Sequence, residues 1–180
     1  MAKKPAKIPN IDAAVKSGVA VVVRKGNKIL VGERIGSHGA GITAFPGGHL
    51  DAVDCRNGRL VNRTGLWVCG ERETFEETGM VVQCLTIDGY REAIFTTSDI
   101  LAEDGTKVYM TSYLLADYVH GGKQIIDGTK EMVEPLEPKK CKMWHWVTID
   151  ELVEMIKTDE QRQWIPLNRV IKYLKEVGLT

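Results

Sequence analysis

One stretch of the sequence decides the fold: Arg72-Glu73-Thr74-Phe75-Glu76-Glu77-Thr78-Gly79. On an α-helix, positions i, i+3 and i+4 project from one side, so Glu73, Glu76 and Glu77 form a single carboxylate cluster. Gly79 follows the last residue of the pattern, at the position where a glycine in the left-handed conformation commonly caps a helix. The spacing therefore predicts a helix over 66–78 that carries three negative charges together.

A cluster of like charges destabilises a helix unless a cation lies among them. Carboxylate oxygens are hard ligands, which suit Mg²⁺ or Mn²⁺ better than a soft metal. Arg72 can pair with Glu76 at i+4 and fix its orientation. Taken alone, three glutamates at this spacing more often indicate a solvated acidic helix face than a metal site.

The remaining positions of this helix predict how it is anchored. Val68 and Phe75 lie seven residues apart, so we expect them to share a face opposite the glutamates and to pack on a sheet. Gly70 lies one turn before Glu73, on the side of the glutamates. We expect it to leave room where a larger side chain would block the site.

The sequence before the helix predicts two strands, over 19–24 and 28–33, joined by a turn at Gly26-Asn27. A glycine-rich loop follows and ends in Pro46-Gly47-Gly48. Such loops let a backbone approach a ligand or an ion closely. The next segment, 54–64, is polar and basic and is interpreted as a surface excursion.

After the helix, strands are expected over 81–97, 107–119 and 144–147, and helices over 148–156 and 167–177. Asp104-Gly105 is the expected turn between the first two strands, and Thr148 and Glu151 form a capping box. Pro166 is expected to delay the last helix. Strands that outnumber helices without regular alternation predict an α/β (α+β) protein with a mixed sheet between helices.

The composition is ordinary for a soluble globular protein, with 43% hydrophobic and 27% charged residues. Its 24 Lys and Arg balance its 24 Asp and Glu, so the charge favours neither a nucleic acid polymer nor a membrane surface. The length of 180 residues, without a repeat or a dividing linker, predicts one domain over 1–180. Within it, residues 1–12 are expected to form a flexible arm.

The four cysteines are scattered, which predicts reduced thiols rather than structural disulfides. No signal-like or membrane-spanning run is present in the sequence. Together these features favour a cytoplasmic protein.

Two motifs carry a resemblance to a known family. Pro46-Gly47-Gly48-His49-Leu50, followed by the helix motif ending in Gly79-Met80, resembles the Nudix box, G-x5-E-x7-R-E-U-x-E-E-x-G-U. The segments Gly32-Glu33-Arg34 and Glu137-Pro138-Lys139-Lys140-Cys141 are similar to parts of MutT-like nucleotide pyrophosphohydrolases. The chain is thus identified as resembling the Nudix hydrolases over most of its length.

The box is stretched in this sequence. After five intervening residues, Gly48 is followed by Asp54 in place of the family's glutamate, and ten residues too many separate Asp54 from Arg72. Counting back from Arg72 instead reaches Thr64. Because the family residue mainly supports the loop and the helix, we expect its loss to be tolerated. The insertion is either an inert surface loop or a source of arginines for phosphate binding or a subunit contact.

The resemblance implies the Nudix fold, an α/β/α sandwich with a mixed sheet, and hydrolysis of a nucleoside diphosphate linked to another group. The favoured substrate is a (d)NTP, cleaved to NMP and pyrophosphate with Mg²⁺ or Mn²⁺, with the sanitising of modified nucleotides as a purpose. Nucleotide sugars, ADP-ribose and diadenosine polyphosphates are alternatives. A non-catalytic Nudix-fold ligand-binding or regulatory protein is a further one, motivated by the stretched box. Many relatives pair, so a homodimer is favoured.

By resemblance, the metal ligands are Glu73, Glu76, Glu77 and the backbone carbonyl of Gly48. The candidate catalytic residues are Glu76, Glu77 and Arg72, the last by orienting the carboxylates. The candidate substrate-binding residues are Arg34, Gly47, His49, Glu137 and Trp164.

Each of these substrate contacts has a plainer alternative. Glu137 is the candidate for a carboxylate outside the helix that accepts a proton, or it is a solvated loop acid. Arg34 is suited to phosphate, or is a plain surface residue. Trp164 is suited to stacking on a purine, with a place in the core as the favoured alternative. His49 gains meaning only from its place beside the glycine turn.

Overall fold

A computed structural model describes residues 14–35, 41–55, 64–86, 93–100, 107–158 and 166–178. The strands are β1 (Ala14–Lys25), β2 (Lys28–Arg34), β3 (Thr43–Ala44), β4 (Met80–Cys84), β5 (Phe95–Ile100), β6 (Lys107–Gly121), β7 (Gln124–Asp127), β8 (Lys130–Val133) and β9 (Cys141–Thr148). The helices are the short 3-10 turn η1 (Ala52–Asp54), α1 (Thr64–Thr78), α2 (Ile149–Thr158) and α3 (Pro166–Glu176).

All the described strands belong to one mixed sheet. Its order is β4-β6-β1-β2-β9-β8-β7, with β3 beside β2 and β5 beside β6. β1 and β6 run parallel over eleven paired positions, from Ala14 with Lys107 to Arg24 with Asp117. The other pairings are antiparallel. The mixed sheet predicted from the sequence is therefore confirmed.

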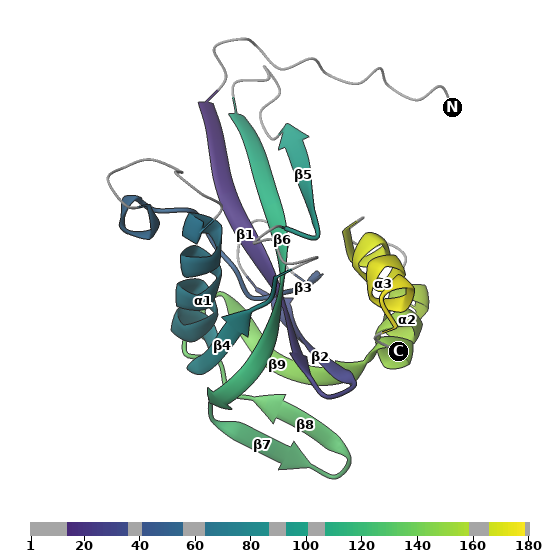
Figure 1. Ribbon diagram of the computed structural model, residues 1–180. Coiled ribbons are helices and arrows are strands. Elements are labelled where there is room, and N and C mark those ends of the chain that lie inside the picture. The colour runs from purple at the N-terminus through teal and green to yellow at the C-terminus, as the bar shows by residue number, and fades with distance from the viewer. Residues whose placement is uncertain are drawn as a thin grey trace.

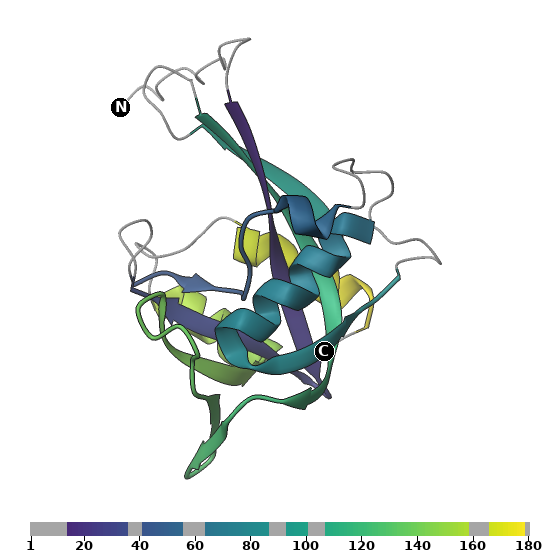
Figure 2. The same ribbon diagram turned by 90° about the vertical axis from the view of Figure 1, so that its left-hand side faces the viewer.

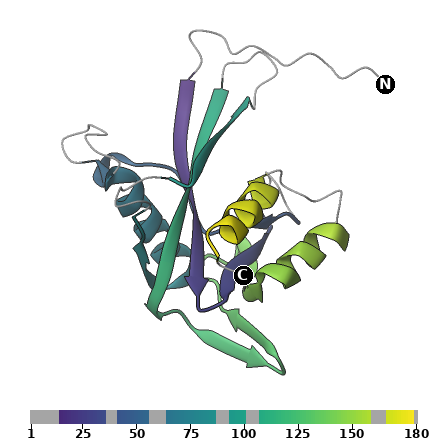
Figure 3. The same ribbon diagram turned by 45° about the vertical axis from the view of Figure 1, so that its right-hand side comes forward.

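Helices cover both faces of the sheet. α1 lies on one face, and α2 and α3 lie on the other (Figures 1 and 3). Because successive residues of a strand face opposite sides, β1 contributes to both cores: Val21 packs on the side of α1, and Val22 packs on the side of α2 and α3. This layering is the predicted α/β/α sandwich.

The predicted anchor of α1 is wrong. Val68 is 44% exposed and Phe75 is 51% exposed, so both lie on the outer face of the helix. The fully buried positions instead carry small residues, including Cys69, Gly70 and Thr74, and the partly buried Leu66 and Trp67 pack against the same core. A Cβ at Gly70 would lie 2.8 Å from Leu114 Cδ1, so this glycine lets the helix approach the sheet rather than opening space at the site. α1 crosses the sheet closely for this reason (Figure 2).

Several predicted boundaries also change. Residues 81–97 were expected to form one strand, but β4 and β5 are separate strands that pair with different halves of β6. The expected turn at Asp104-Gly105 lies outside the described residues, as does the arm over 1–12. The β7–β8 hairpin was not predicted, because its strands are short and mostly exposed and so lack an apolar pattern.

Other local predictions are confirmed. Gly26 and Gly79 adopt φ of 61° and 70°, as a turn and a helix cap require. The capping box of α2 is present: Glu151 N–H donates to Thr148 Oγ1 at 3.2 Å, and Thr148 N–H donates to Glu151 Oε2 at 2.7 Å. All four cysteines are free. Within the described part of the chain, none of the helices has the length and apolar character needed to cross a membrane.

The glycine loop before α1 runs beside β1 as an added strand. Val21 N–H donates to Pro46 O at 2.8 Å, Val19 N–H donates to Gly48 O at 2.9 Å, and Leu50 N–H donates to Ser17 O at 2.9 Å. A Cβ at Gly18 would lie 2.6 Å from Gly48 O, which is backbone and cannot turn aside. Gly18 therefore permits the loop to pair with β1.

We predict that Gly18→Ala lowers the free energy of unfolding by about 1–3 kcal/mol, because the loop must move away from β1. Gly128→Ala is the control, since Gly128 has φ of 60° in the β7–β8 turn but no atom within 4 Å of an added Cβ. It should lose only about 1 kcal/mol, from backbone strain. Urea unfolding measures both variants, and equal losses would contradict the packing role of Gly18.

Candidate active site

Two buried carboxylates of α1 face the glycine loop. Glu73 and Glu77 are 6% and 8% exposed. A Cβ at Gly48 would overlap the Glu73 carboxylate, so only glycine allows this approach. Gly47 N–H donates to Glu77 Oε2 at 3.2 Å. The backbone of the loop thus contacts the carboxylates of the helix directly, with no loop side chain between them.

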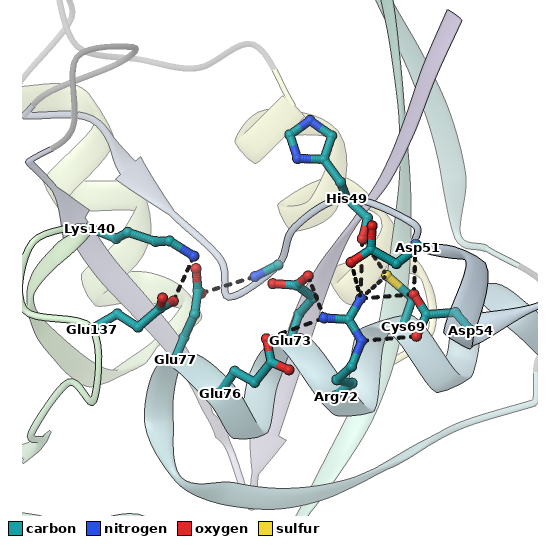
Figure 4. Close-up of polar contacts among 11 residues, drawn as sticks. His49, Asp51, Asp54, Cys69, Arg72, Glu73, Glu76, Glu77, Glu137 and Lys140 are labelled. Atoms are coloured by element: carbon teal, nitrogen blue, oxygen red, sulfur yellow. Dashed lines mark hydrogen bonds and ion pairs between the residues drawn. The ribbon is translucent and has the colours of Figure 1, made fainter.

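Arg72 connects the loop to the helix (Figure 4). Its Nε donates to Asp54 Oδ1 at 2.9 Å, and its Nη2 donates to Asp54 Oδ2 at 2.8 Å. Its Nη1 donates to Glu73 Oε1 at 2.8 Å and to Glu76 Oε2 at 3.2 Å. The hydrogen bonds that Arg72 donates to Asp54 and, to a smaller extent, to Glu73 raise the pKa of Arg72. The expected pairing of Arg72 with Glu76 is present, but Asp54 and Glu73 are the closer partners.

Asp54 is the residue that the stretched box left in doubt. It is 4% exposed and also accepts the Asp51 N–H at 2.9 Å. Burial alone would raise the pKa of Asp54, but the Arg72 and Asp51 hydrogen bonds hold it below its usual value. Of the two positions reached by counting, Asp54 makes the contact with the arginine, and Thr64 begins α1.

The segment 54–64 is therefore not a surface excursion at its two ends. Asp54 is buried because it forms an ion pair with Arg72, and Thr64 is already helical. The residues between them, 56–63, lie outside the described part of the chain.

The pKa of Glu77 is strongly perturbed by its surroundings. Burial raises the pKa of Glu77 to about 7, and the nearby Glu73 and Glu137 act in the same direction. The Gly47 N–H and the positive charge of Lys140 oppose this rise. The Glu77 carboxylate is thus poorly neutralised by the protein, because no cation bonds to it directly in the described residues.

A turn between β8 and β9 closes the other side of the cluster. Leu136 N–H donates to Glu77 O at 2.9 Å, which ties this turn to α1. Lys140 Nζ lies 2.7 Å from Glu137 Oε2, and this hydrogen bond raises the pKa of Lys140. Glu137 therefore lies beside the helix carboxylates, although it is sixty residues away in the sequence (Figure 4).

The remaining candidates lie at different distances from this cluster. Gly48 O accepts the Val19 N–H, so it points toward β1 and has only its second lone pair for an ion. The His49 ring points away from the carboxylates and packs against Tyr109, with 5.4 Å between ring centroids (Figure 4). Arg34 ends β2 beside the Glu137 turn, where Ile35 N–H donates to Lys140 O at 3.0 Å. Trp164 lies outside the described residues.

Sequence reasoning missed two members of the cluster. Asp54 was one of two positions reached by counting and was given no role, and Lys140 was quoted only as part of a motif. Among the described residues, no three His, Cys, Asp or Glu side chains already converge as a metal's ligands would. Glu73 and Glu76 are instead paired with Arg72, and Glu137 is paired with Lys140.

Comparison with known proteins places this geometry in a family. Residues 15–169 match the NUDIX domain. The chain is similar to a NUDIX hydrolase from Alicyclobacillus acidocaldarius, with a TM-score of 0.60 and 16% identity over 89% of this chain and 90% of that one. A NUDIX hydrolase from Nitrosomonas europaea gives a TM-score of 0.57 and 19% identity over 92% and 90%. A MutT NUDIX hydrolase from Burkholderia pseudomallei gives 0.53 and 18% over 76% and 85%.

At these identities the solved structures show a shared fold, and the family match extends over most of the chain. The protein therefore belongs to the NUDIX family and is a pyrophosphohydrolase that acts on nucleoside diphosphate derivatives.

Proposed function

We propose that the protein hydrolyses a (d)NTP to NMP and pyrophosphate with Mg²⁺ or Mn²⁺, and that sanitising modified nucleotides is its purpose. One observation carries the proposal: two buried carboxylates, Glu73 and Glu77, face the backbone of Gly47 and Gly48 with no side chain between them. A site with bare backbone and several carboxylates suits a cation bound to phosphate.

The donor set fits a hard divalent cation. The proposed ligands are the carboxylates of Glu73, Glu76 and Glu77, with the Gly48 carbonyl using its second lone pair. Burial raises the pKa of Glu77 to about 7, because the charged form of a buried carboxylate is destabilised when no cation bonds to it directly. A bound cation would stabilise the charged carboxylate. Oxygen donors of this kind favour Mg²⁺ or Mn²⁺.

The proposed reaction is attack of water on phosphorus. A bond forms between the water oxygen and the α- or β-phosphorus, and the bond from that phosphorus to the oxygen bridging the two breaks. The leaving group, pyrophosphate after attack on the α-phosphorus or NMP after attack on the β-phosphorus, carries the electron pair away. When bound, the ion would neutralise phosphate oxygens and lower the pKa of the water. Glu137, outside the helix, is our candidate to accept the proton, with Glu76 or Glu77 as alternatives. Arg72 would keep Glu73 and Glu76 oriented.

The other substrate contacts are proposed from their positions. Gly47 would approach the phosphates with its backbone, Arg34 lies beside the Glu137 turn, and His49 follows the glycine pair. Trp164 is retained as a candidate for base stacking. A homodimer and a cytoplasmic location also remain proposals.

The central prediction is that the purified protein with Mg²⁺ releases pyrophosphate from at least one (d)NTP in a broad panel. Glu77→Gln should lower kcat by about a hundredfold or more, because a charged ligand is lost. Glu71→Gln is a matched control on the same helix, since glutamine still accepts the Cys84 N–H that Glu71 Oε1 accepts at 3.1 Å. Pyrophosphate release with and without EDTA is the measurement.

The panel also separates the alternatives. It includes nucleotide sugars, ADP-ribose and diadenosine polyphosphates, whose turnover would keep the reaction and change the substrate. Tight nucleotide binding without any Mg²⁺-dependent turnover would favour the binding or regulatory protein. An equal loss of activity in Glu71→Gln and Glu77→Gln would contradict the proposed role of Glu77 as a metal ligand.

A second prediction concerns Arg72. Arg72→Gln leaves buried Asp54 without its cation and should lower the free energy of unfolding by about 3 kcal/mol. Arg24→Gln is the control, since Arg24 also pairs with an aspartate, Asp117, but at a half-exposed position. It should lose about 1 kcal/mol or less. Denaturant unfolding compares them, and similar losses would contradict a buried structural ion pair at Asp54.

A third prediction concerns pH without divalent ions. The folded protein holds the Glu77 proton up to about pH 7, whereas the unfolded chain loses it near its ordinary pKa of 4.5. Between these values the folded state binds more protons, so this residue lowers stability as pH rises. Glu77→Gln should therefore be more stable than wild type at pH 8, by up to about 3 kcal/mol, and the difference should vanish near pH 4.

Thermal or urea unfolding at pH 4, 6 and 8 in EDTA measures this difference. Carboxylates that do not interact with Glu77 contribute equally to both proteins, so they cancel in the comparison. A difference that is constant with pH would show that Glu77 is not a strained acid in the folded state.

A further inference from the structure

Arg72 and Lys140, the two cationic side chains beside the carboxylate cluster, differ in how many N–H groups are not already bonded to the protein. A guanidinium has five N–H groups. Arg72 directs them to Asp54, Glu73, Glu76 and the His49 carbonyl, the last at 3.2 Å. Arg72 is thus fully occupied by the protein and has no donor for a substrate.

Lys140 is in the opposite situation. An ammonium has three N–H groups, and its one ion pair among the described residues joins Nζ to Glu137 Oε2 at 2.7 Å. Its side chain is 56% exposed. In Figure 4 the ammonium lies at the cluster, next to both Glu77 and Glu137. It therefore has donors to spare and lies beside the carboxylates proposed to bind metal.

The backbone holds Lys140 in this place. Lys140 N–H donates to Glu137 O at 2.9 Å, and Lys140 O accepts the Ile35 N–H at 3.0 Å. The turn is tied to α1 through Leu136 and Glu77. The lysine is consequently positioned by β2 and α1. Its neighbour Lys139 is exposed and makes no comparable backbone hydrogen bond or ion pair among the described residues.

We propose that Lys140 binds the diphosphate of the substrate directly. This inference rests on the proposed function, because it takes a cation to lie among Glu73, Glu76 and Glu77. The ammonium keeps its ion pair with Glu137 and offers its other N–H groups to phosphate oxygens, which are favoured acceptors for a charged donor. Lys140 is then a substrate-binding residue, whereas Arg72 positions carboxylates.

The charge of Lys140 should affect the binding of metal and the binding of diphosphate in opposite directions. Without substrate, the positive charge of Lys140 opposes the arrival of a divalent cation at the same cluster. With the cation bound, the same charge attracts the diphosphate. Removing the charge should therefore strengthen the binding of metal alone and weaken the binding of diphosphate. A lysine that only supported the turn would weaken both.

The experiment compares Lys140→Gln, Lys140→Arg and the control Lys139→Gln with the wild-type protein. Electron paramagnetic resonance measures Mn²⁺ binding without nucleotide, and calorimetry measures imidodiphosphate binding at saturating Mn²⁺. For Lys140→Gln we expect Mn²⁺ to bind about threefold tighter or more. Imidodiphosphate should bind about tenfold weaker or more. Lys140→Arg, which keeps the charge, and Lys139→Gln should both stay within about twofold of wild type.

Each outcome decides a separate question. If Lys140→Gln weakens both ligands, or changes neither, the substrate-binding role of Lys140 is overturned while the metal site stands. If Lys139→Gln behaves like Lys140→Gln, the effect is general surface charge and the proposal fails. If wild-type protein binds no Mn²⁺, the proposed function itself fails. Glu137→Gln adds a check, because loss of a negative charge should weaken Mn²⁺ binding, opposite to Lys140→Gln.

Discussion

The structure of the site depends on the ion pair between Arg72 and Asp54. Asp54 is buried at the end of the loop, and Arg72 comes from the middle of α1, so this contact fixes the loop against the helix. The same guanidinium holds Glu73 and Glu76. A buried carboxylate without its cation is unstable, so loop and helix must come together for either to be satisfied. The insertion between them lengthens the connection but leaves the contact intact, since a longer loop adds little to the entropy of closure.

Three glycines permit the close layering around this contact. Gly18 makes room for the carbonyl of Gly48, and Gly48 makes room for the carboxylate of Glu73. On the same helix, Gly70 makes room for Leu114 of the sheet. The strand thus meets the loop backbone to backbone at Gly18, and a single side chain separates the loop from the helix at Gly48 and the helix from the sheet at Gly70. The carboxylates are buried because the backbone approaches them, and burial is what raises the pKa of Glu77.

The sequence predicted the elements whose signals are local. Gly79, Gly26 and the capping box at Thr148 act within a few residues, and each was placed correctly. Prediction from the sequence failed where tertiary packing determines which residues are in contact. Val68 and Phe75 were expected to anchor α1, but the helix packs through small residues with Leu66 and Trp67 beside them. Periodicity does not show which side of a mixed helix meets the sheet. The partnership of Asp54 with Arg72 was obscured by the insertion, because counting along the chain gives two answers and only the fold selects one. Lys140 carried no signal beyond its motif, because its place beside Glu77 depends on a pairing with β2.

The cluster has an uneven distribution of positive charge, and this unevenness suits a catalyst better than a structural site. Glu73 is neutralised by Arg72, whereas Glu77 has only a backbone N–H and the nearby charge of Lys140. A symmetrical cluster of ion pairs would be stable without any ligand and would gain little from one. Here one side is neutralised by the fold, and the other is the side at which we propose that a cation and its phosphate bind. Because the stable half holds the geometry, the unsatisfied half can bind and release ligands without unfolding the helix.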